Sequence, residues 1–186
     1  MKKYKCLIQS EWISDNFSLI PIRNDDKLAI LKMRNEQIYH LRQAELLTLE
    51  MQEAYFENVV AKLFDQKNPN QILFTFLEKG EFIGYGGLVH INWIDKNAEV
   101  SFIMRTELEK EKFSYYWENY LSLLEKVAFK DLNFHKIFTY AFDLRPHLYS
   151  VLEKSGFREE ARLKEHCCFQ GKYLDVVINS KLNRNA

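Results

Sequence analysis

The chain has 186 residues, of which 47% are apolar and 15% aromatic, so it can bury the core of one ordinary domain and is not expected to be disordered. Its 26 Lys and Arg residues balance its 26 Asp and Glu residues. A neutral chain lacks the general attraction of a basic protein for nucleic acid or an anionic membrane. We therefore predict a single domain over residues 1–186, with neither of these as a partner.

Three cysteines, Cys6, Cys167 and Cys168, form an odd set with two adjacent members, which does not fit a disulfide framework. Their spacing is not that of zinc ligands, so we expect packing roles and no metal. The basic first five residues precede only a three-residue apolar stretch, and no run approaches the roughly 20 apolar residues of a membrane span. This pattern predicts a cytoplasmic protein.

The first part of the chain predicts a strand and two helices. Residues 17–22 indicate the strand, after which Asn24-Asp25-Asp26 can cap a helix that extends to about Arg34. Thr48 can cap the second helix. Apolar residues recur every four positions on one face of this second helix: Met51, Tyr55, Val59 and Leu63.

The middle and the end of the chain predict most of the sheet. Strands are expected over residues 72–77, 82–92 and 98–105, and an apolar stripe of three- and four-residue spacing predicts a helix over about 111–129. The rest follows as a strand, a short helix and two hairpin strands: 136–142, 146–154, 159–169 and 173–182. Interleaved helices and hairpins predict an α/β fold with a mixed sheet flanked by helices.

Six segments in this order carry a family resemblance: Ile83-Gly84-Tyr85-Gly86-Gly87-Leu88, residues 98–102, 132–137, 151–157, 161–165 and 170–176. Together they resemble the GNAT superfamily of N-acetyltransferases over residues 17–182. The final third resembles the branch that includes ribosomal-protein alanine acetyltransferases and sugar-nucleotide acetyltransferases. The resemblance implies the acyl-CoA N-acyltransferase fold, acetyl-CoA as co-substrate and direct transfer to a primary amine without a metal.

The chain departs from this family at the pyrophosphate-binding loop. Members usually carry Gln/Arg-x-x-Gly-x-Gly/Ala there, so that bare backbone amides at a helix N-terminus hold the phosphates. The aligned residues are 112–117, and the two glycine positions hold Tyr115 and Trp117. Three interpretations stay open: side-chain cations replace the amides, the helix starts earlier and leaves room elsewhere, or the chain has kept the fold and lost acetyl-CoA.

The resemblance also implies where the donor lies, in a wedge between the strand that ends near Met104 and the strand that begins at Lys136. It assigns backbone groups of one strand to the pantetheine arm and thioester. Cationic side chains near the wedge would then face the phosphates. The predicted cofactor-binding residues are Ser101, Phe102, Ile103, Met104, Lys110, Lys112 and Arg145.

Three residues are candidates for proton transfer. Glu99 shares a strand face with Ser101 and could accept the proton of the attacking amine, although such a residue can equally be a strand-end ion pair. His90 is a second candidate base, against a structural histidine. Tyr149 could protonate the leaving thiolate, against a partly buried core tyrosine.

The resemblance implies an N-acetyltransferase for a small-molecule amine, and the similarity of residues 83–100 and of the aromatic helix to polysaccharide-locus members favours an amino-sugar nucleotide of surface-polysaccharide synthesis as the acceptor. A protein N-terminal amine is the alternative acceptor, and a non-catalytic binding module is the alternative class. Trp93, Tyr115 and Tyr173 are candidates for lining the acceptor site, because aromatic faces stack on sugars and bases. Either a monomer or a homodimer is compatible with the sequence.

Overall fold

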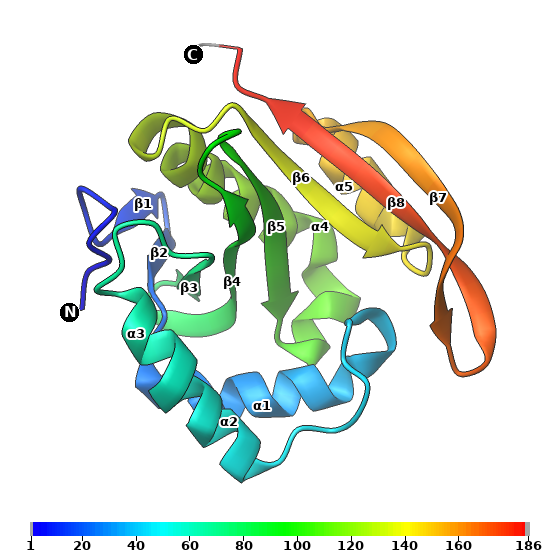
Figure 1. The fold of residues 1–186 in the computed structure, drawn as a ribbon, viewed down its shortest axis with the longest axis horizontal. Helices are drawn as coiled ribbons and strands as arrows, with labels where there is room; N and C mark the ends of the chain where they lie inside the picture. The colour runs from blue at the N-terminus through cyan, green and yellow to red at the C-terminus, as the bar shows by residue number, and fades with distance from the viewer. Residues whose placement is uncertain (1, 185–186) are drawn as a thin grey trace.

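The computed structural model describes residues 2–184, which form one eight-stranded sheet with helices on both sides (Figure 1). The strand order is β1-β2-β3-β4-β5-β6-β8-β7. Its strands are β1 Trp12–Ser14, β2 Phe17–Pro21, β3 Ile72–Glu78, β4 Glu81–Asn92, β5 Asn97–Met104, β6 Lys136–Phe142, β7 Arg158–Phe169 and β8 Lys172–Leu182.

Five α-helices accompany the sheet within the described residues: α1 Lys27–Glu36, α2 Leu49–Tyr55, α3 Ala61–Leu63, α4 Thr106–Glu125 and α5 Pro146–Lys154. Short 3₁₀ helices cover Asn24–Asp26 and Ile38–His40, and π-helical segments continue α2 at Phe56–Val60 and α4 at Lys126–Asp131. The helices α4 and α5 lie side by side behind the sheet in Figure 1, whereas α1 and α2 lie together across its lower end. No described helix is both long enough and apolar enough to cross a membrane.

The one parallel contact among the described strands is between β5 and β6. Its register covers only three pairs, Asn97↔Lys136, Ala98↔Ile137 and Glu99↔Phe138. Beyond Glu99 the two strands continue without pairing, to the ends of β5 and β6. The predicted wedge is therefore present in the centre of the sheet.

Alternation along β5 places its residues on two different layers. Phe102 stacks on Tyr120 of α4, with ring centroids 3.9 Å apart, and also contacts Trp117 at 5.1 Å. Glu99 and Ser101 point to the opposite side, because successive strand residues alternate. The wedge is thus flanked by an aromatic layer on the α4 side and by polar groups on the α1 side.

The α/β fold and its mixed sheet are confirmed, and three local predictions need correction. The strand β1 is additional to the predicted set. The helix α4 begins at Thr106 rather than near Glu111, with a break at Lys112. The face of α2 and its π-helical continuation that carries Met51, Tyr55 and Val59 is exposed; the buried positions of this helical stretch, which ends with α3, are Gln52, Phe56, Val60 and Leu63.

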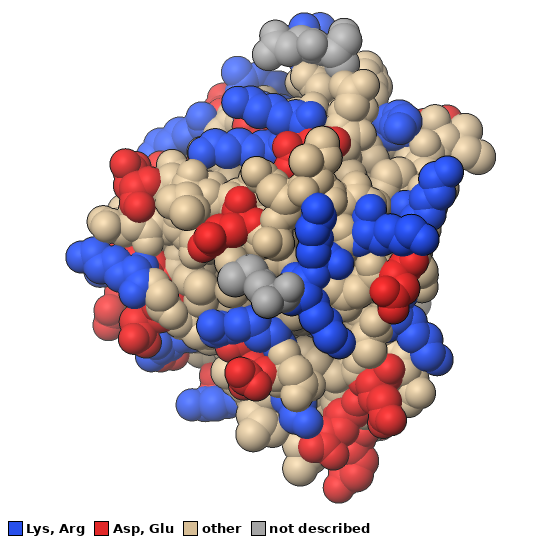
Figure 2. Space-filling model, turned by 90° about the vertical axis from the view of Figure 1, so that its left-hand side faces the viewer, with Lys and Arg blue, Asp and Glu red and all other residues tan. Residues whose placement is uncertain are grey.

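The surface reflects the balanced composition. On the face beside β1, β2 and α3, basic and acidic side chains are interspersed, with acidic side chains gathered at one lower corner (Figure 2). This face therefore presents no extended field of a single sign.

Candidate active site

A cavity of about 490 Å³ lies at the opening between β5 and β6. Glu99, Ser101 and Ile103 line it from one side of the sheet, and Phe102 and Trp117 line it from the side of α4. Residues from both layers take part because the parallel pairing has ended there. The cavity therefore connects the two sides of the sheet.

Two of the predicted proton-transfer residues meet in this cavity. His90 Nδ1 lies 2.8 Å from Oε2 of Glu99, whose residue is only 6% exposed. The pairing of β4 with β5 is irregular between Val89 and Asn92, and His90 has a φ of 48°. Such a bulge re-aims a side chain, and here it turns His90 toward Glu99.

The contact indicates which ring nitrogen of His90 carries a hydrogen. An ionised carboxylate only accepts hydrogen bonds, so Nδ1 of His90 must carry the hydrogen of the bond to Glu99. The lone pair of a neutral imidazole then lies on Nε2. Since the His90 side chain is 65% exposed, this nitrogen is accessible from solvent and from a ligand. The pair has the base-and-orienter arrangement of many acyl-transfer sites.

Arg42 completes this group and was missed by sequence reasoning. It lies in the segment that follows the 3₁₀ helix Ile38–His40, and its Nη2 forms a close ion pair with Oε1 of Glu99. Its guanidinium also lies 4.6 Å from the ring centroid of Tyr140 on β6. Both oxygens of Glu99 are therefore engaged, one by Arg42 and one by His90. No local sequence pattern predicts a role for Arg42, because its partner Glu99 is 57 positions away in the chain.

The predicted donor-binding residues separate into two groups. Ser101, Phe102, Ile103 and Arg145 lie in the cavity wall, whereas Met104 is buried beside it, and its carbonyl oxygen accepts a hydrogen bond from Nε2 of Gln37 at 2.8 Å. Lys110 and Lys112 are exposed on α4 and lie outside the wall. Of the three predicted cations, the structure therefore brings only Arg145 to the cavity.

Arg145 already has an anionic partner. Its Nη1 donates to Oε1 of Glu109 at 3.0 Å, and both side chains are largely buried. Nε2 of His40 lies 3.5 Å from the same Nη1. Burial, and then the charge of Arg145, lower the pKa of His40 to about 3. His40 is therefore neutral near pH 7 and adds no positive charge beside Arg145.

Acid should destabilise the fold through His40. Its pKa is about 3 in the folded protein, below the usual 6.5, so the unfolded chain binds the proton more tightly. This contribution is absent above pH 6.5 and costs about 1.4 kcal/mol per pH unit as the pH falls from there toward 3. Urea denaturation from pH 7 to pH 4.5 should show a shallower loss for His40→Asn than for wild type. Parallel curves would contradict this account.

Of the two bulky residues at the family's glycine positions, Tyr115 lies away from the wedge and Trp117 lines it on the α4 side. Tyr115 contacts Phe17 with ring centroids 5.4 Å apart, and its hydroxyl donates to Glu78, on the side of β2 and β3. Trp117 is buried against Phe102 and forms part of the cavity wall. At Lys112 the backbone leaves the helical range, with φ −136° and ψ 32°. A separate helical segment, residues 106–111, therefore precedes the expected loop position.

Comparison with known proteins decides the family. Residues 19–178 match the family described as the acetyltransferase (GNAT) domain.

The chain belongs to the GNAT acetyltransferase family.

A spermidine N(1)-acetyltransferase from Vibrio cholerae serotype O1 is 32% identical over 108 residues, a stretch that spans 55% of this chain and 61% of that enzyme. The crystal structure of spermidine N-acetyltransferase from Vibrio cholerae in complex with CoA and spermine has a TM-score of 0.77 at 21% identity and covers 91% of this chain and 97% of that one. Mutant forms of the same organism's enzyme give 0.75, with 21% identity and coverage of 91% and 95%. The predicted family, GNAT fold and acetyl-CoA as the co-substrate of this family are confirmed; the finer branch stays a prediction.

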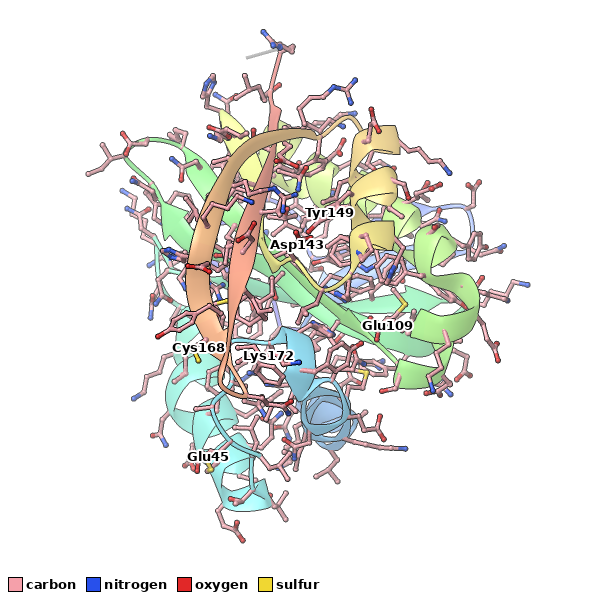
Figure 3. All side chains as sticks on the ribbon, turned by 90° about the vertical axis from the view of Figure 1, so that its right-hand side faces the viewer. Glu45, Glu109, Asp143, Tyr149, Cys168 and Lys172 are labelled. Carbon is pink, nitrogen blue, oxygen red and sulfur yellow. The ribbon has the colours of Figure 1, made fainter. Side chains whose placement is uncertain are left out.

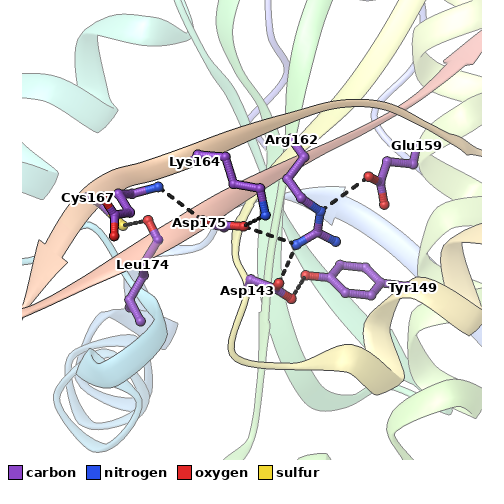
Figure 4. Close-up of polar contacts among 9 residues, drawn as sticks. Asp143, Tyr149, Glu159, Arg162, Lys164, Cys167, Leu174 and Asp175 are labelled. Carbon is purple, nitrogen blue, oxygen red and sulfur yellow. Dashed lines mark hydrogen bonds and ion pairs between the residues drawn. The ribbon is translucent and has the colours of Figure 1, made fainter.

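Tyr149 occupies a different place from the other GNAT site candidates. It lies on α5 and donates its hydroxyl to Oδ1 of Asp143 at 2.6 Å, while Arg162 of β7 pairs closely with the other oxygen of Asp143 (Figures 3 and 4). Burial, and then the carboxylate of Asp143, raise the pKa of Tyr149. Its hydroxyl is thus committed to a network that ties α5 to the hairpin, and Tyr149 does not line the cavity. Its acid role stays a prediction.

The aromatic residues suggested for an acceptor site lie elsewhere. Trp93 donates Nε1 to the carbonyl of Pro69 at 2.8 Å and packs on Phe134. Tyr115 faces β2, as described above, and Tyr173 is exposed on the β7–β8 hairpin. None of the three lines the cavity. Within residues 2–184, no three His, Cys, Asp or Glu side chains gather as a metal site would require.

Thr139 is a further residue of the cavity that the sequence did not indicate. It lies on β6 just beyond the last β5–β6 pair, is 3% exposed, and its Oγ1 is buried without a hydrogen-bond partner among the described residues. A buried hydroxyl without a partner costs about 1–3 kcal/mol. A ligand amide in the wedge could supply the missing bond.

Thr139→Val is therefore expected to have opposite effects on the free protein and on its complex. Removing the unpaired hydroxyl should stabilise the free protein by about 1 kcal/mol, and acetyl-CoA should bind about fivefold more weakly. Denaturation and calorimetric titration measure the two quantities. Thr75→Val is the matched control, because Thr75 is equally buried but donates to Asp26 at 2.7 Å, so its loss should destabilise. Destabilisation by both variants would remove Thr139 from the site.

Proposed function

We propose that this chain transfers the acetyl group of acetyl-CoA to the primary amine of a small acceptor. The observation that carries the proposal is the cavity through the wedge, with His90 held by Glu99 on its α1 side and the predicted donor-binding residues of β5 along it. The wedge supports donor binding because the edge of β5 that faces β6 is not paired with that strand beyond Glu99. An enzyme is therefore favoured over a binding module that has lost acetyl-CoA.

His90 is the proposed base. Nε2 takes a proton from the acceptor ammonium, and the neutral amine nitrogen attacks the carbonyl carbon of the thioester. Glu99 holds the imidazole through Nδ1 and stabilises the positive charge that the imidazole gains. As the new C–N bond forms, the nitrogen releases its second proton to solvent, and the C–S bond breaks so that the sulfur leaves with the bond's electron pair as a thiolate; a neutral amide results. Protonation of that thiolate by Tyr149 stays part of the prediction, although Asp143 now competes for its proton.

The charge of the cavity bears on the acceptor. Its wall contains Arg34, Arg42 and Arg145, while Glu99 is the one carboxylate residue among its lining side chains. Such a wall favours an acceptor that carries anionic groups, and an amino-sugar nucleotide meets this requirement. A polyamine is the second candidate, since the similar Vibrio enzyme is a spermidine N(1)-acetyltransferase. A polycation would, however, face Arg34, whose hydrogen-bond partners Gln43 and Tyr85 are neutral, whereas Arg42 and Arg145 are already paired with Glu99 and Glu109. A protein N-terminal amine remains the third.

The test is an acetylation assay with acetyl-CoA and three acceptors: a nucleoside-diphosphate-linked amino sugar, spermidine, and a peptide with a free N-terminus. Release of CoA thiol measures turnover, and the expected order places the amino-sugar nucleotide first. A thermal shift with acetyl-CoA runs in parallel, because saturation at a hundred times Kd adds about 2.7 kcal/mol of stability. No shift at millimolar acetyl-CoA and no turnover would favour the non-catalytic module.

Arg145 and Glu109 give the donor side of the proposal its own test. Arg145→Gln should weaken acetyl-CoA binding about tenfold, because a charge-assisted bond to phosphate is lost. Glu109→Gln should have the opposite sign, since it releases Arg145 from its 3.0 Å partner. Calorimetric titration of both variants measures these changes. Equal weakening by both would mean that the pair acts only as a structural ion pair.

A further inference from the structure

A second cavity of about 320 Å³ lies on the α1 side of the sheet, beside the one described above. Its buried walls include Ile22, Ile30 and Phe56, and its rim includes Met51 and Tyr55 of α2, which are 42% and 36% exposed. The wall is thus apolar and aromatic, with an opening toward solvent along α2. The proposed acetyl transfer makes no use of this space.

Two hydrogen bonds join the walls of the two cavities. Arg34 of α1 lines both cavities and donates Nη1 to the hydroxyl of Tyr85 at 3.0 Å. Gln71 lines the first cavity and donates Nε2 to the hydroxyl of Tyr55, which lines the second, at 3.0 Å. The junction therefore consists of one guanidinium, one amide and two phenols, which are groups that bind phosphate oxygens and ring edges.

The strand register gives the distance between the proposed base and the junction of the two cavities. Val89 pairs with Glu99, next to the proposed base, and Tyr85 pairs with Ile103. Four residues of β4 at roughly 3.3 Å each place these points about 13 Å apart. A ligand that reaches from His90 into the second cavity must therefore be long, with its middle beside Arg34.

We propose that the second cavity binds the nucleoside of an acceptor in which a diphosphate links that nucleoside to the amine-bearing group. The inference rests on the proposed acetyl transfer and names its substrate class. The base packs between Tyr55 and the apolar wall, because aromatic rings stack on planar bases. The diphosphate lies at Arg34, whose planar guanidinium suits two phosphate oxygens. The amine then lies at Nε2 of His90.

The binding test uses nucleoside diphosphates without an amine. Uridine, thymidine, cytidine and guanosine 5′-diphosphates are titrated into the full chain, alone and in the presence of saturating CoA. CoA is included because it contains an adenosine diphosphate of its own, so a nucleotide that binds only at the donor site would be displaced. We expect at least one of the four to bind with CoA present. Binding that CoA abolishes, or no binding by any of the four, would overturn the inference.

A pair of variants locates the binding. Met51→Trp places an indole at the rim of the second cavity and should weaken binding of that nucleoside diphosphate at least tenfold. Leu49→Trp is the matched control, because Leu49 lies on the same helix with 43% exposure but does not line the cavity. It should leave binding unchanged. Equal effects of the two substitutions would overturn the assignment.

Failure of this inference can be separated from failure of the proposed function. Binding of acetyl-CoA and acetylation of free glucosamine, which has no nucleotide to place, are measured on the same preparations. Met51→Trp should keep both while losing the nucleoside diphosphate. Turnover of glucosamine without any nucleotide binding would contradict the nucleoside site alone. Failure of the wild-type protein to bind acetyl-CoA would contradict the proposed acetyl transfer.

Discussion

His90→Asn is expected to lower kcat by about 10²–10⁴-fold while leaving acetyl-CoA binding unchanged. The amide of Asn can still donate to Glu99 as Nδ1 of His90 does at 2.8 Å, so the geometry around the carboxylate is kept. Asn has no counterpart of the basic Nε2, and the acceptor ammonium loses its proton acceptor. Single-turnover kinetics, with a titration of acetyl-CoA beside them, measure the two quantities.

Glu99→Gln tests the other half of the pair. An amide can donate to Nδ1 of His90, which would move the imidazole proton to Nε2 and remove the base from the cavity. Turnover should therefore fall, though by less than in His90→Asn, because both tautomers remain accessible with a neutral partner. The reverse order, with turnover nearly intact in His90→Asn and abolished in Glu99→Gln, would make Glu99 the base and His90 its neighbour.

The fold could be predicted from the sequence because its signals are local. Alternation along β5, the spacing of the α4 stripe and the Gln170-Gly171 turn each depend on neighbouring residues. The family resemblance then placed Glu99, Ser101 and Arg145 in one cavity. These residues lie on central elements whose positions follow from strand order, so their meeting follows from topology.

The parts that could not be predicted depend on long-range partners. Arg42 is a loop residue whose role comes from its ion pair with Glu99. Glu109 is a helix residue whose role comes from its ion pair with Arg145. No sequence pattern links the two members of either pair. The exposed face of α2 has a different cause. The helix continues through the π segment Phe56–Val60, so a stripe extrapolated at α-helical spacing need not be the buried one.

The close approach of α4 to β4 explains a further residue of the family-like segment, Gly86. An added Cβ at this position would lie 2.0 Å from the carbonyl oxygen of Ser101 and 2.6 Å from the hydroxyl of Tyr120. That hydroxyl donates to the same Ser101 carbonyl at 2.8 Å, on the side of β5 that faces β4. Only a residue without a side chain leaves room for this bond.

Gly86→Ala should therefore destabilise the protein by about 3 kcal/mol, the upper part of the usual range for overpacking, and weaken acetyl-CoA binding in whatever fraction stays folded. Gly171→Ala is the control, since its Cβ would meet nothing within 4 Å and only its φ of 75° opposes the change; about 1–2 kcal/mol is expected there. Adding Tyr120→Phe to Gly86→Ala should restore part of the stability, because it removes the 2.6 Å contact but not the clash with the Ser101 carbonyl. Equal losses for Gly86→Ala and Gly171→Ala would show that backbone freedom, rather than the approach of Tyr120, accounts for glycine at position 86.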